Sequence, residues 1–413
     1  MIILLEKILS EAVENKISDV HFEPLEQGLR VRFRKDGFLY EYLNNLNNLN
    51  LLKLEDGEKI ISRIKVLADL NIAEKRLPQD GQFSREFNKN KIDFRVSTCP
   101  TRWGEKIVLR LQESEKKRLS LEQLGLNQEA LKLLKQALGK SQGLIIVTGP
   151  TGSGKTLSLY SALEVLNSVK KNICTVEDPI EMNLSGVNQV NVQNKIGLDF
   201  SKVLTAFLRQ DPDVMMVGEI RDLETAQIAV KAAHTGHLVL STLHTNSALE
   251  SLTRLSGMGV KAYEVASAIS LLIAQRLIRK LCDDCKQEDP EGLVNLEKFL
   301  KESGLGSLGS LVSGDLDIFL ERAKNKNKKI KIYKPAAAPN ACPFCTEGFQ
   351  GRTACFEVIP MTDPLAELIL SGASILDLRA YANSQGYLNL LEAGLEKVLQ
   401  GETVLEEVLH GVL

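Results

Sequence analysis

A glycine-rich segment with the spacing of a phosphate-binding loop occupies residues 149–156. Its sequence, Gly-Pro-Thr-Gly-Ser-Gly-Lys-Thr, matches G-x-x-x-x-G-K-[ST] at every fixed position. In such loops the glycines let backbone N–H groups turn towards phosphate oxygens, the lysine reaches the terminal phosphates, and the last hydroxyl ligates a metal ion. We therefore expect a nucleoside triphosphate site, with Mg²⁺ beside Thr156, that is made of Gly149, Pro150, Thr151, Gly152, Ser153, Gly154, Lys155 and Thr156.

The segments on either side of this loop have the patterns of a buried strand and a helix. Residues 144–147 form a continuous apolar run, which is typical of a strand covered on both faces. Residues 157–169 have helical character, so the loop would lie at a helix N-terminus, where the dipole favours anions. Apolar runs and helical segments then alternate as far as residue 243. This alternation predicts an α/β fold with a mostly parallel sheet.

Two groups of carboxylates directly follow apolar runs of this kind. The first group contains Glu177, Asp178 and Glu181, and the second begins with Glu219. The carboxyl ends of parallel strands face the crevice where open α/β sheets bind ligands. Phosphoryl transfer needs a metal ion and a residue that positions water. Glu219 is our first candidate for contacting the magnesium-bound water, and Glu177 and Glu181 compete with it for the role of general base.

Two histidines flank a further apolar run at residues 238–243. His237 comes directly before this run, and His244 comes directly after it. A histidine at a strand end can sense the γ-phosphate in a catalytic site, or it can simply satisfy a backbone carbonyl. The spacing by itself favours neither role.

Four of the seven cysteines form two Cys-x-x-Cys pairs, Cys282/Cys285 and Cys342/Cys345. Two such pairs commonly build a tetrahedral Cys₄ zinc site. A redox-active Cys-x-x-Cys is the alternative, but neither pair opens a thioredoxin-like βαβ unit. We therefore expect these four cysteines to bind Zn²⁺. The zinc would stabilise a folded surface that a partner protein can contact. Structural roles are expected for the remaining cysteines, which are Cys99, Cys174 and Cys355.

The first part of the chain has the pattern of a separate, small α+β unit. Apolar residues recur at helical spacing over residues 2–13. Strict alternation over residues 29–34 turns at Asp36-Gly37 into a second strand, which predicts a β-hairpin with arginines on its outer face. The further elements that we expect are a loop at 44–50, a helix near 58–70 and strands near 91–96 and 106–111.

Length and charge limit the classes of protein to which this chain can belong. Its 413 residues favour two or three domains. The formal net charge of -2 supplies no positive field for nucleic acid, so we expect no nucleic-acid partner. No apolar stretch approaches the roughly 20 residues that are needed to cross a bilayer. Glu6 and Lys7 interrupt the apolar run at the N-terminus, whereas a signal peptide needs a longer apolar segment there. We therefore expect a cytoplasmic protein.

Taken in chain order, these motifs resemble those of the secretion ATPases that power type II secretion and type IV pilus assembly. The resemblance covers nearly the whole chain and rests on eight clustered motifs in the family's order. Residues 18–24, 32–37, 77–81 and 93–97 look like the family's second N-terminal domain. The remaining matches are 149–156 to the phosphate loop, 175–181 to the Asp box, 208–222 to the Walker B region and 235–246 to the His box.

The resemblance implies a RecA-like ATPase domain, preceded by a small α+β domain of PAS-like type, in a homo-hexameric ring. ATP would lie between the two domains, with Asp178 and Arg209 joining its site. Arg95 and Arg110 of the N-terminal domain are the candidates to reach the γ-phosphate. The family usually has arginine after Gln-Asp-Gly, but this chain has Gln82. Charge compensation would then rest more heavily on Arg95, or hydrolysis would be slow.

The resemblance also sets the expected boundaries of the domains. Residues 1–112 would form the N-terminal domain and residues 113–119 a charged linker. Residues 120–280 would form the ATPase core, 281–360 the tetracysteine subdomain and 361–413 a helical subdomain. Family members also have a first N-terminal domain that docks a cytoplasmic protein, and we expect that domain to be absent here.

The function that the resemblance implies is a motor for building protein filaments. ATP hydrolysis, with Mg²⁺, would drive assembly of pilin or pseudopilin subunits through a polytopic inner-membrane platform protein, with the motor held at the membrane by its partners. The system would be a type IV pilus, a competence system or a type II secretion system. The cysteine pairs resemble those of assembly and secretion members, since retraction motors lack them. Two alternatives stay open. One is a RecA-like nucleic-acid translocase, and the other, suggested by Gln82, is a weakly hydrolysing, nucleotide-dependent scaffold.

Overall fold

The computed structural model describes residues 2–42, 51–87, 90–113, 119–292, 294, 298, 331–336, 342 and 345–412. The loop predicted at 44–50, the linker residues 114–118 and most of the segment between the two cysteine pairs lie outside these residues. The chain divides into two compact units, Met1–Lys117 and Arg118–Leu413.

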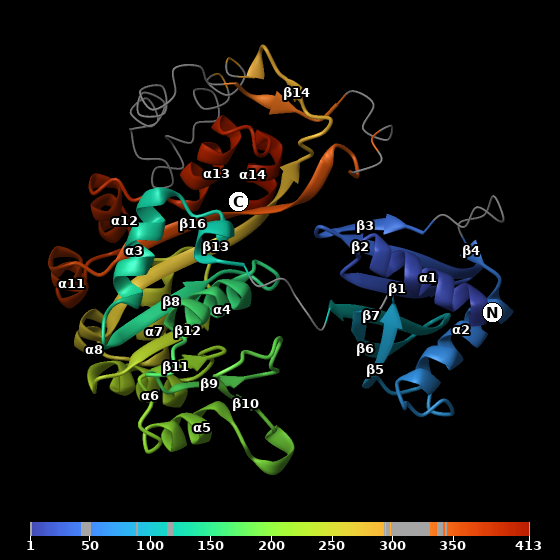
Figure 1. Ribbon diagram of the computed structural model, residues 1–413, viewed down its shortest axis with the longest axis horizontal. Coiled ribbons are helices and arrows are strands. Elements are labelled where there is room, and N and C mark those ends of the chain that lie inside the picture. The colour runs from blue at the N-terminus through green and yellow to red at the C-terminus, as the bar shows by residue number, and fades with distance from the viewer. Residues whose placement is uncertain are drawn as a thin grey trace. The chain divides into compact units, whose positions relative to one another are not determined.

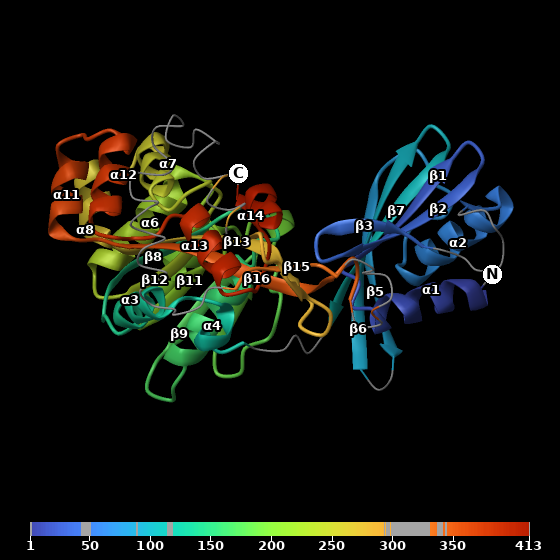
Figure 2. The same ribbon diagram turned by 90° about the horizontal axis from the view of Figure 1, so that it is seen from above.

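The first unit is an antiparallel sheet with two helices packed on one face (Figure 2). The strand order is β3-β2-β1-β7-β6-β5, with the short β4 beside β2. Apolar residues of both helices and of alternate strand positions form a single core, which confirms the predicted α+β unit. Its elements are α1 (Ile2–Glu14), β1 (Asp19–Leu25), β2 (Gly28–Lys35), β3 (Phe38–Glu41), β4 (Leu51–Leu52), α2 (Leu54–Leu67), β5 (Gln79–Phe87), β6 (Asn90–Thr101) and β7 (Gly104–Glu113).

The arginines of the predicted hairpin are held by a carboxylate on the neighbouring strand. Strands β2 and β3 form the hairpin, and Arg30 and Arg32 of β2 both donate to Glu23 of β1. Lys106 Nζ lies 2.9 Å from the same carboxyl group. Burial raises the pKa of Glu23, but the hydrogen bonds from Arg32, Lys106 and Arg30 outweigh this effect and lower the pKa to about 2. One carboxylate therefore offsets part of the positive charge on this face of the sheet.

The second unit has a sheet in the order β10-β9-β11-β12-β8-β13-β16. Every neighbouring pair is parallel except β13 with β16, which confirms the predicted α/β class. Helices cover both faces (Figure 1). Its elements as far as residue 243 are η1 (Leu121–Leu124), α3 (Gln128–Leu138), β8 (Gly143–Thr148), α4 (Lys155–Leu166), β9 (Ile173–Glu177), β10 (Asn188–Asn191), η2 (Asn194–Ile196), α5 (Phe200–Phe207), β11 (Val214–Val217), α6 (Leu223–His234) and β12 (Leu238–Leu243).

The rest of this unit completes the sheet and adds helices to it. Strand β13 pairs with β8 in parallel on one side, and on the other side it pairs antiparallel with β16 along most of its length. Strand β16 lies within the segment 281–360, whose limits as a tetracysteine subdomain stay a prediction. The elements are α7 (Glu250–Met258), α8 (Ala262–Ala268), β13 (Ile269–Leu281), β14 (Gln287–Glu288), β15 (Tyr333–Lys334), β16 (Phe349–Pro360), α11 (Asp363–Leu370), α12 (Ile375–Ser384), α13 (Leu390–Leu399) and α14 (Leu405–Val412).

Two hydrophobic cores lie on opposite faces of this sheet. Helices α3 and α4 and the turn η1 cover one face, while α5 to α8 and the C-terminal helices cover the other. Because both faces are covered, strands β8, β9, β11 and β12 are buried at every position, as their apolar runs predict. Across the part of the chain that the structure describes, none of the helices is long and apolar enough to cross a membrane.

Candidate functional site

The loop between β8 and α4 wraps back on itself, as a phosphate-binding loop does. Gly149 and Gly154 have φ values of +147° and +88°, in the region that only glycine enters easily. Lys155 is the first residue of α4, and its Nζ donates to the carbonyls of Gly149 at 2.7 Å and Pro150 at 2.9 Å. Thr156 follows it and is exposed. The ammonium group and the N-terminus of α4 therefore face the same loop, where they favour an anion.

Lys155 is an unusual lysine, because most of its side chain is buried. Burial lowers its pKa to about 8, and the nearby carboxylate of Glu219 opposes this shift. The group is therefore still charged at neutral pH, but it has lost much of its hydration. Contact with a phosphate would stabilise a desolvated ammonium group of this kind.

Adjacent strand ends bring the two carboxylate groups together. In the parallel pairing of β9 with β11, Val217 lies opposite Val176, so Asp178 and Glu219 both follow at the same edge of the sheet. Arg221 connects them, with a hydrogen bond from Nη2 to Glu219 and Nη1 at 3.8 Å from Asp178 Oδ2. Glu219 is thus at the centre of a charged cluster beside the phosphate loop.

His244 belongs to the same cluster. It directly follows β12, whose last residue, Leu243, pairs with Thr148 at the end of β8. Its Nε2 lies 3.6 Å from Glu219 Oε2. Burial and the charge of Lys155 lower the pKa of His244, while Glu219 acts in the opposite direction. The imidazole is therefore neutral at pH 7 and can act as either a donor or an acceptor.

The two other candidate glutamates differ sharply in their surroundings. Glu177 is buried, and its carboxylate accepts hydrogen bonds from Tyr160 Oη, Thr175 Oγ1 at 2.6 Å and Gln189 Nε2 at 3.0 Å. Glu181 is half-buried, and its backbone N–H donates to the Tyr160 hydroxyl at 3.2 Å. Glu177 therefore has its acceptor capacity largely used within the fold, which suits a structural anchor better than a base.

Two of the predicted residues lie at the opposite edge of the sheet from the phosphate loop. His237 precedes β12, whose first residue pairs with Gly143 at the start of β8, and its Nδ1 lies 3.1 Å from the carbonyl of Ala232. The length of β8 separates it from the loop, about 20 Å at 3.3 Å per residue. Arg209 is exposed and precedes β11 at the same far edge. The chain itself does not bring either residue to the phosphate loop.

The candidate arginines of the first unit share one row of its sheet. Arg95 of β6 lies in register with Gln82 of β5 on one side and with Arg110 of β7 on the other. Side chains of directly paired residues point to the same face. Arg110 donates from Nε to Asp19 Oδ1 at 2.9 Å. The position where this chain has Gln82 therefore adjoins Arg95 directly.

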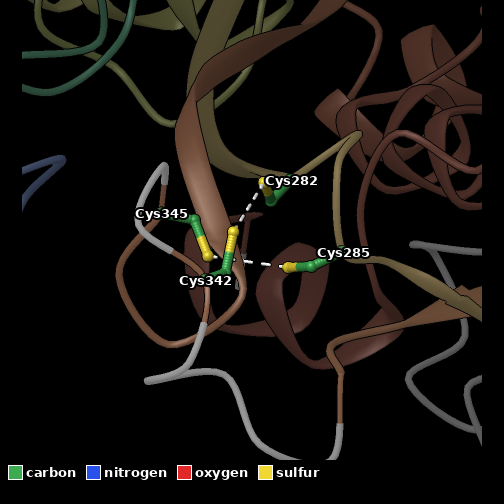
Figure 3. A group of neighbouring side chains, drawn as sticks. All are labelled: Cys282, Cys285, Cys342 and Cys345. Carbon is green, nitrogen blue, oxygen red and sulfur yellow. Dashed lines mark hydrogen bonds between the residues drawn. The ribbon is translucent and has the colours of Figure 1, made fainter.

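The four paired cysteines converge on one point (Figure 3). Their Sγ atoms all lie within 4.8 Å of one another, with Cys282 to Cys342 at 4.0 Å and Cys285 to Cys345 at 3.6 Å. A tetrahedral Zn–S distance of about 2.3 Å would place sulfurs about 3.8 Å apart. Both the donor set and its spacing therefore fit a metal ion held by four thiolates. Of the other three, Cys174 and Cys355 are buried, and Cys99 is exposed.

Three polar residues beside the loop do not follow from motif spacing. Tyr160 lies within an apolar helix pattern, and Gln275 and Arg276 interrupt the apolar run of β13. All three are buried and hydrogen-bonded. The signal in the sequence was the pair of consecutive polar residues within the apolar stretch 271–278, because such residues need partners when they are buried.

Comparison with known proteins identifies the relatives of this chain. A family model described as type II/IV secretion system protein matches residues 1–410. The type IV pilus assembly ATPase PilB of Pseudomonas aeruginosa is 46% identical over 403 residues, which cover 97% of this chain and 66% of that protein. The type II secretion system protein E of Aeromonas hydrophila is 41% identical over 408 residues, which cover 98% of this chain and 74% of that protein. The chain thus spans just under two thirds of the length of the first relative.

Solved structures share the same fold. The ATPase DotB of Legionella pneumophila has a TM-score of 0.68 at 18% identity, covering 99% of this chain and 95% of that chain. The pilus retraction motor PilT, solved with bound ADP, has a TM-score of 0.59 at 25% identity, covering 98% of this chain and 96% of that chain. The predicted RecA-like class of the second unit is therefore confirmed.

Proposed function

Because this chain belongs to the family of type II/IV secretion system proteins, we propose that it is an ATPase motor for the assembly or secretion of protein subunits. One observation carries the proposal: Lys155 at the start of α4, Glu219 after β11 and His244 after β12 meet beside one phosphate loop. The names of its relatives support the same activity, since one is a pilus assembly ATPase and another a type II secretion protein.

Each residue of this cluster has a task that its position supports. The phosphate loop and Lys155 would bind the triphosphate, and Thr156 and Glu219 would hold Mg²⁺ and its bound water. Mg²⁺ neutralises charge on the phosphates when it is bound with the nucleotide. Glu181 is the better candidate for the general base, because Glu177 is buried and already accepts three hydrogen bonds. A general base needs a carboxylate that can reach water.

Zinc is the metal that we propose for the tetracysteine site. Four thiolates without an open coordination position are typical of structural zinc. The cluster joins the end of β13, where Cys282 lies, to the start of β16, which follows Cys345. A metal ion there would stabilise the end of this pair of strands and offer a surface to a partner.

The assembled motor is proposed to be a homo-hexamer that acts on a polytopic inner-membrane platform protein. The pilus and secretion relatives support this assignment, and the choice between the pilus and secretion systems stays open. Arg95 and Arg110 are proposed to supply positive charge to the γ-phosphate in this assembly. Electron microscopy with a non-hydrolysable ATP analogue tests it, since six-fold or two-fold rings are expected. Particles that stay monomeric would contradict the hexamer.

Steady-state ATP hydrolysis tests the activity. We expect measurable turnover by the wild-type chain and a loss of at least about 100-fold in Lys155→Ala, because the ammonium group stabilises the charge that develops on the phosphates. Lys140→Ala is the matched control, since Lys140 is exposed in the same unit. Equal turnover by the wild type and Lys155→Ala would refute the catalytic assignment.

A further inference from the structure

Strand β13 passes directly beside the phosphate loop. In its parallel pairing with β8, Ala274 lies opposite Thr148, the last residue of β8. The next two residues, Gln275 and Arg276, are therefore level with the start of the loop. Because consecutive side chains of a strand point to opposite faces, these two reach different surroundings. Both are buried.

Gln275 faces α4 and fills the space beneath the loop. Its Oε1 accepts a hydrogen bond from Ser158 Oγ at 2.7 Å, and the two residues are 2% and 7% exposed. Its Nε2 would lie 2.7 Å from a Cβ placed on Gly154, and its carbonyl oxygen 2.5 Å from a Cβ placed on Gly149. Either distance is a collision. The loop is therefore packed against Gln275 at both of these glycines, in addition to what a phosphate requires of them.

Arg276 extends towards the loop that follows β12, and its Nη1 would also lie 3.3 Å from a Cβ placed on Gly149. Its Nη2 donates to the carbonyl of Asn246 at 2.8 Å, and its Nη1 donates to the carbonyl of Gln275 at 3.2 Å. Glu357 of β16 accepts from the N–H of Ala248 at 3.0 Å. The buried side chains of Arg276 and Glu357 thus hold alternate residues of the segment that begins just after His244.

The segment held in this way directly follows His244 in the chain. Thr245 donates from its N–H to Thr148 Oγ1 at 2.8 Å, which ties the start of the segment to the end of β8. Asn246 is then fixed by Arg276. With the two residues that follow His244 held in this way, its Nε2 lies 3.6 Å from Glu219 Oε2.

We propose that Gln275 and Arg276 are positioning residues with separate tasks. Gln275 maintains the shape of the phosphate loop and therefore sets the affinity for nucleotide. Arg276 maintains the position of His244 against Glu219 and therefore sets the rate of turnover. The second task rests on the proposed ATPase function, whereas the first requires only that the chain binds a nucleotide.

The test compares binding and turnover in two variants. Gln275→Met keeps the length of the side chain but removes the acceptor for Ser158. We expect the Kd for a fluorescent ADP analogue to rise about tenfold, since a buried hydroxyl loses its partner, while kcat at saturating ATP stays within about threefold. For Arg276→Gln we expect the Kd to stay within about twofold and kcat to fall at least about tenfold. Arg276→Lys, which keeps a charged donor, should recover part of that kcat.

Arg279→Gln is the matched control. Arg279 is another largely buried arginine of β13, but it pairs with Glu407 and stacks on Phe349, away from the loop. We expect neither Kd nor kcat to change by more than about twofold. Ser158→Ala offers a smaller change on the Gln275 side, and it should raise the Kd by a similar factor. The double variant with Gln275→Met should show no further increase, because both changes remove the same contact.

The outcomes separate the two proposals. Equal changes of Kd and kcat in Gln275→Met and Arg276→Gln, or additive effects of Ser158→Ala and Gln275→Met, would overturn the two tasks. If the wild type binds the ADP analogue but hydrolyses no ATP, the ATPase function fails and the task of Arg276 fails with it. The task of Gln275 is then still decided by the Kd values.

Discussion

Arg221 donates a hydrogen bond to Glu219, and the same guanidinium lies 3.8 Å from the carboxylate of Asp178. One cation thus connects the residues that follow β11 and β9. Glu219 is also the residue proposed to contact magnesium-bound water. Arg221 and a bound Mg²⁺ would therefore compete for this carboxylate, because a carboxylate that is engaged by arginine interacts more weakly with a second cation.

Arg221→Gln is therefore expected to lower the Mg²⁺ concentration that gives half-maximal ATP turnover. The pair is partly exposed, so the expected shift is modest, about threefold. Magnesium titrations of steady-state turnover measure it. Arg254→Gln serves as the control, because Arg254 is exposed on α7. A midpoint that stays unchanged or rises in Arg221→Gln would show that the ion pair does not compete with the metal.

Glu181 and Glu177 should respond differently to the same substitution. Glu181→Gln is expected to lower turnover at least about 100-fold with an unchanged melting temperature, because a general base is lost. Glu177→Gln replaces an acceptor of three hydrogen bonds, and it should destabilise the second unit by about 1–3 kcal/mol. Tyr160→Phe removes one of these three hydrogen bonds, and it should therefore cause part of the same loss of stability. Calorimetry and turnover measured on all three variants decide the assignment, which fails if Glu181→Gln hydrolyses ATP at the wild-type rate.

The tetracysteine cluster should bind one zinc ion per chain. Elemental analysis of the purified protein measures this directly, and Cys282→Ser should lose the metal because one of the four thiolates is missing. Cys99→Ser is the matched control, since Cys99 lies outside the cluster and should leave the zinc content unchanged. A folded wild-type protein without metal would rule out the site.

Nucleotide affinity should weaken above pH 8. Burial lowers the pKa of Lys155 to about 8, so the free protein holds the charged ammonium group below that pH and loses it above. Binding of an anionic nucleotide favours the charged form, and each pH unit above 8 should therefore raise the Kd by up to about tenfold. Below pH 8 the protonation of Lys155 should cause no further change in the Kd. Lys155→Gln has no such group, and the same titration of that variant should lack the upward turn.

Much of this protein could be predicted from short stretches of sequence. The buried strands at 144–147 and 214–217 and the first hairpin depend on neighbours in the chain, so periodicity and turn residues predicted them, and the structure confirms them. The family was also evident from its motifs and is confirmed by the match over residues 1–410. Local rules suffice here because backbone conformation and burial of a single element are decided within a few residues.

The tertiary structure decided which of the candidates meet. His237 and His244 flank the same strand and are equally plausible as sequence, yet only His244 lies at the edge that carries the phosphate loop, because parallel strands place all their carboxyl ends together. Glu177 and Glu181 likewise look alike until Tyr160, Thr175 and Gln189 converge on the first. Gln275 and Arg276 gained a role only when β13 was placed beside β8. Sequence spacing cannot supply such contacts, since they depend on how the strands and helices pack and join residues up to 117 positions apart in the chain.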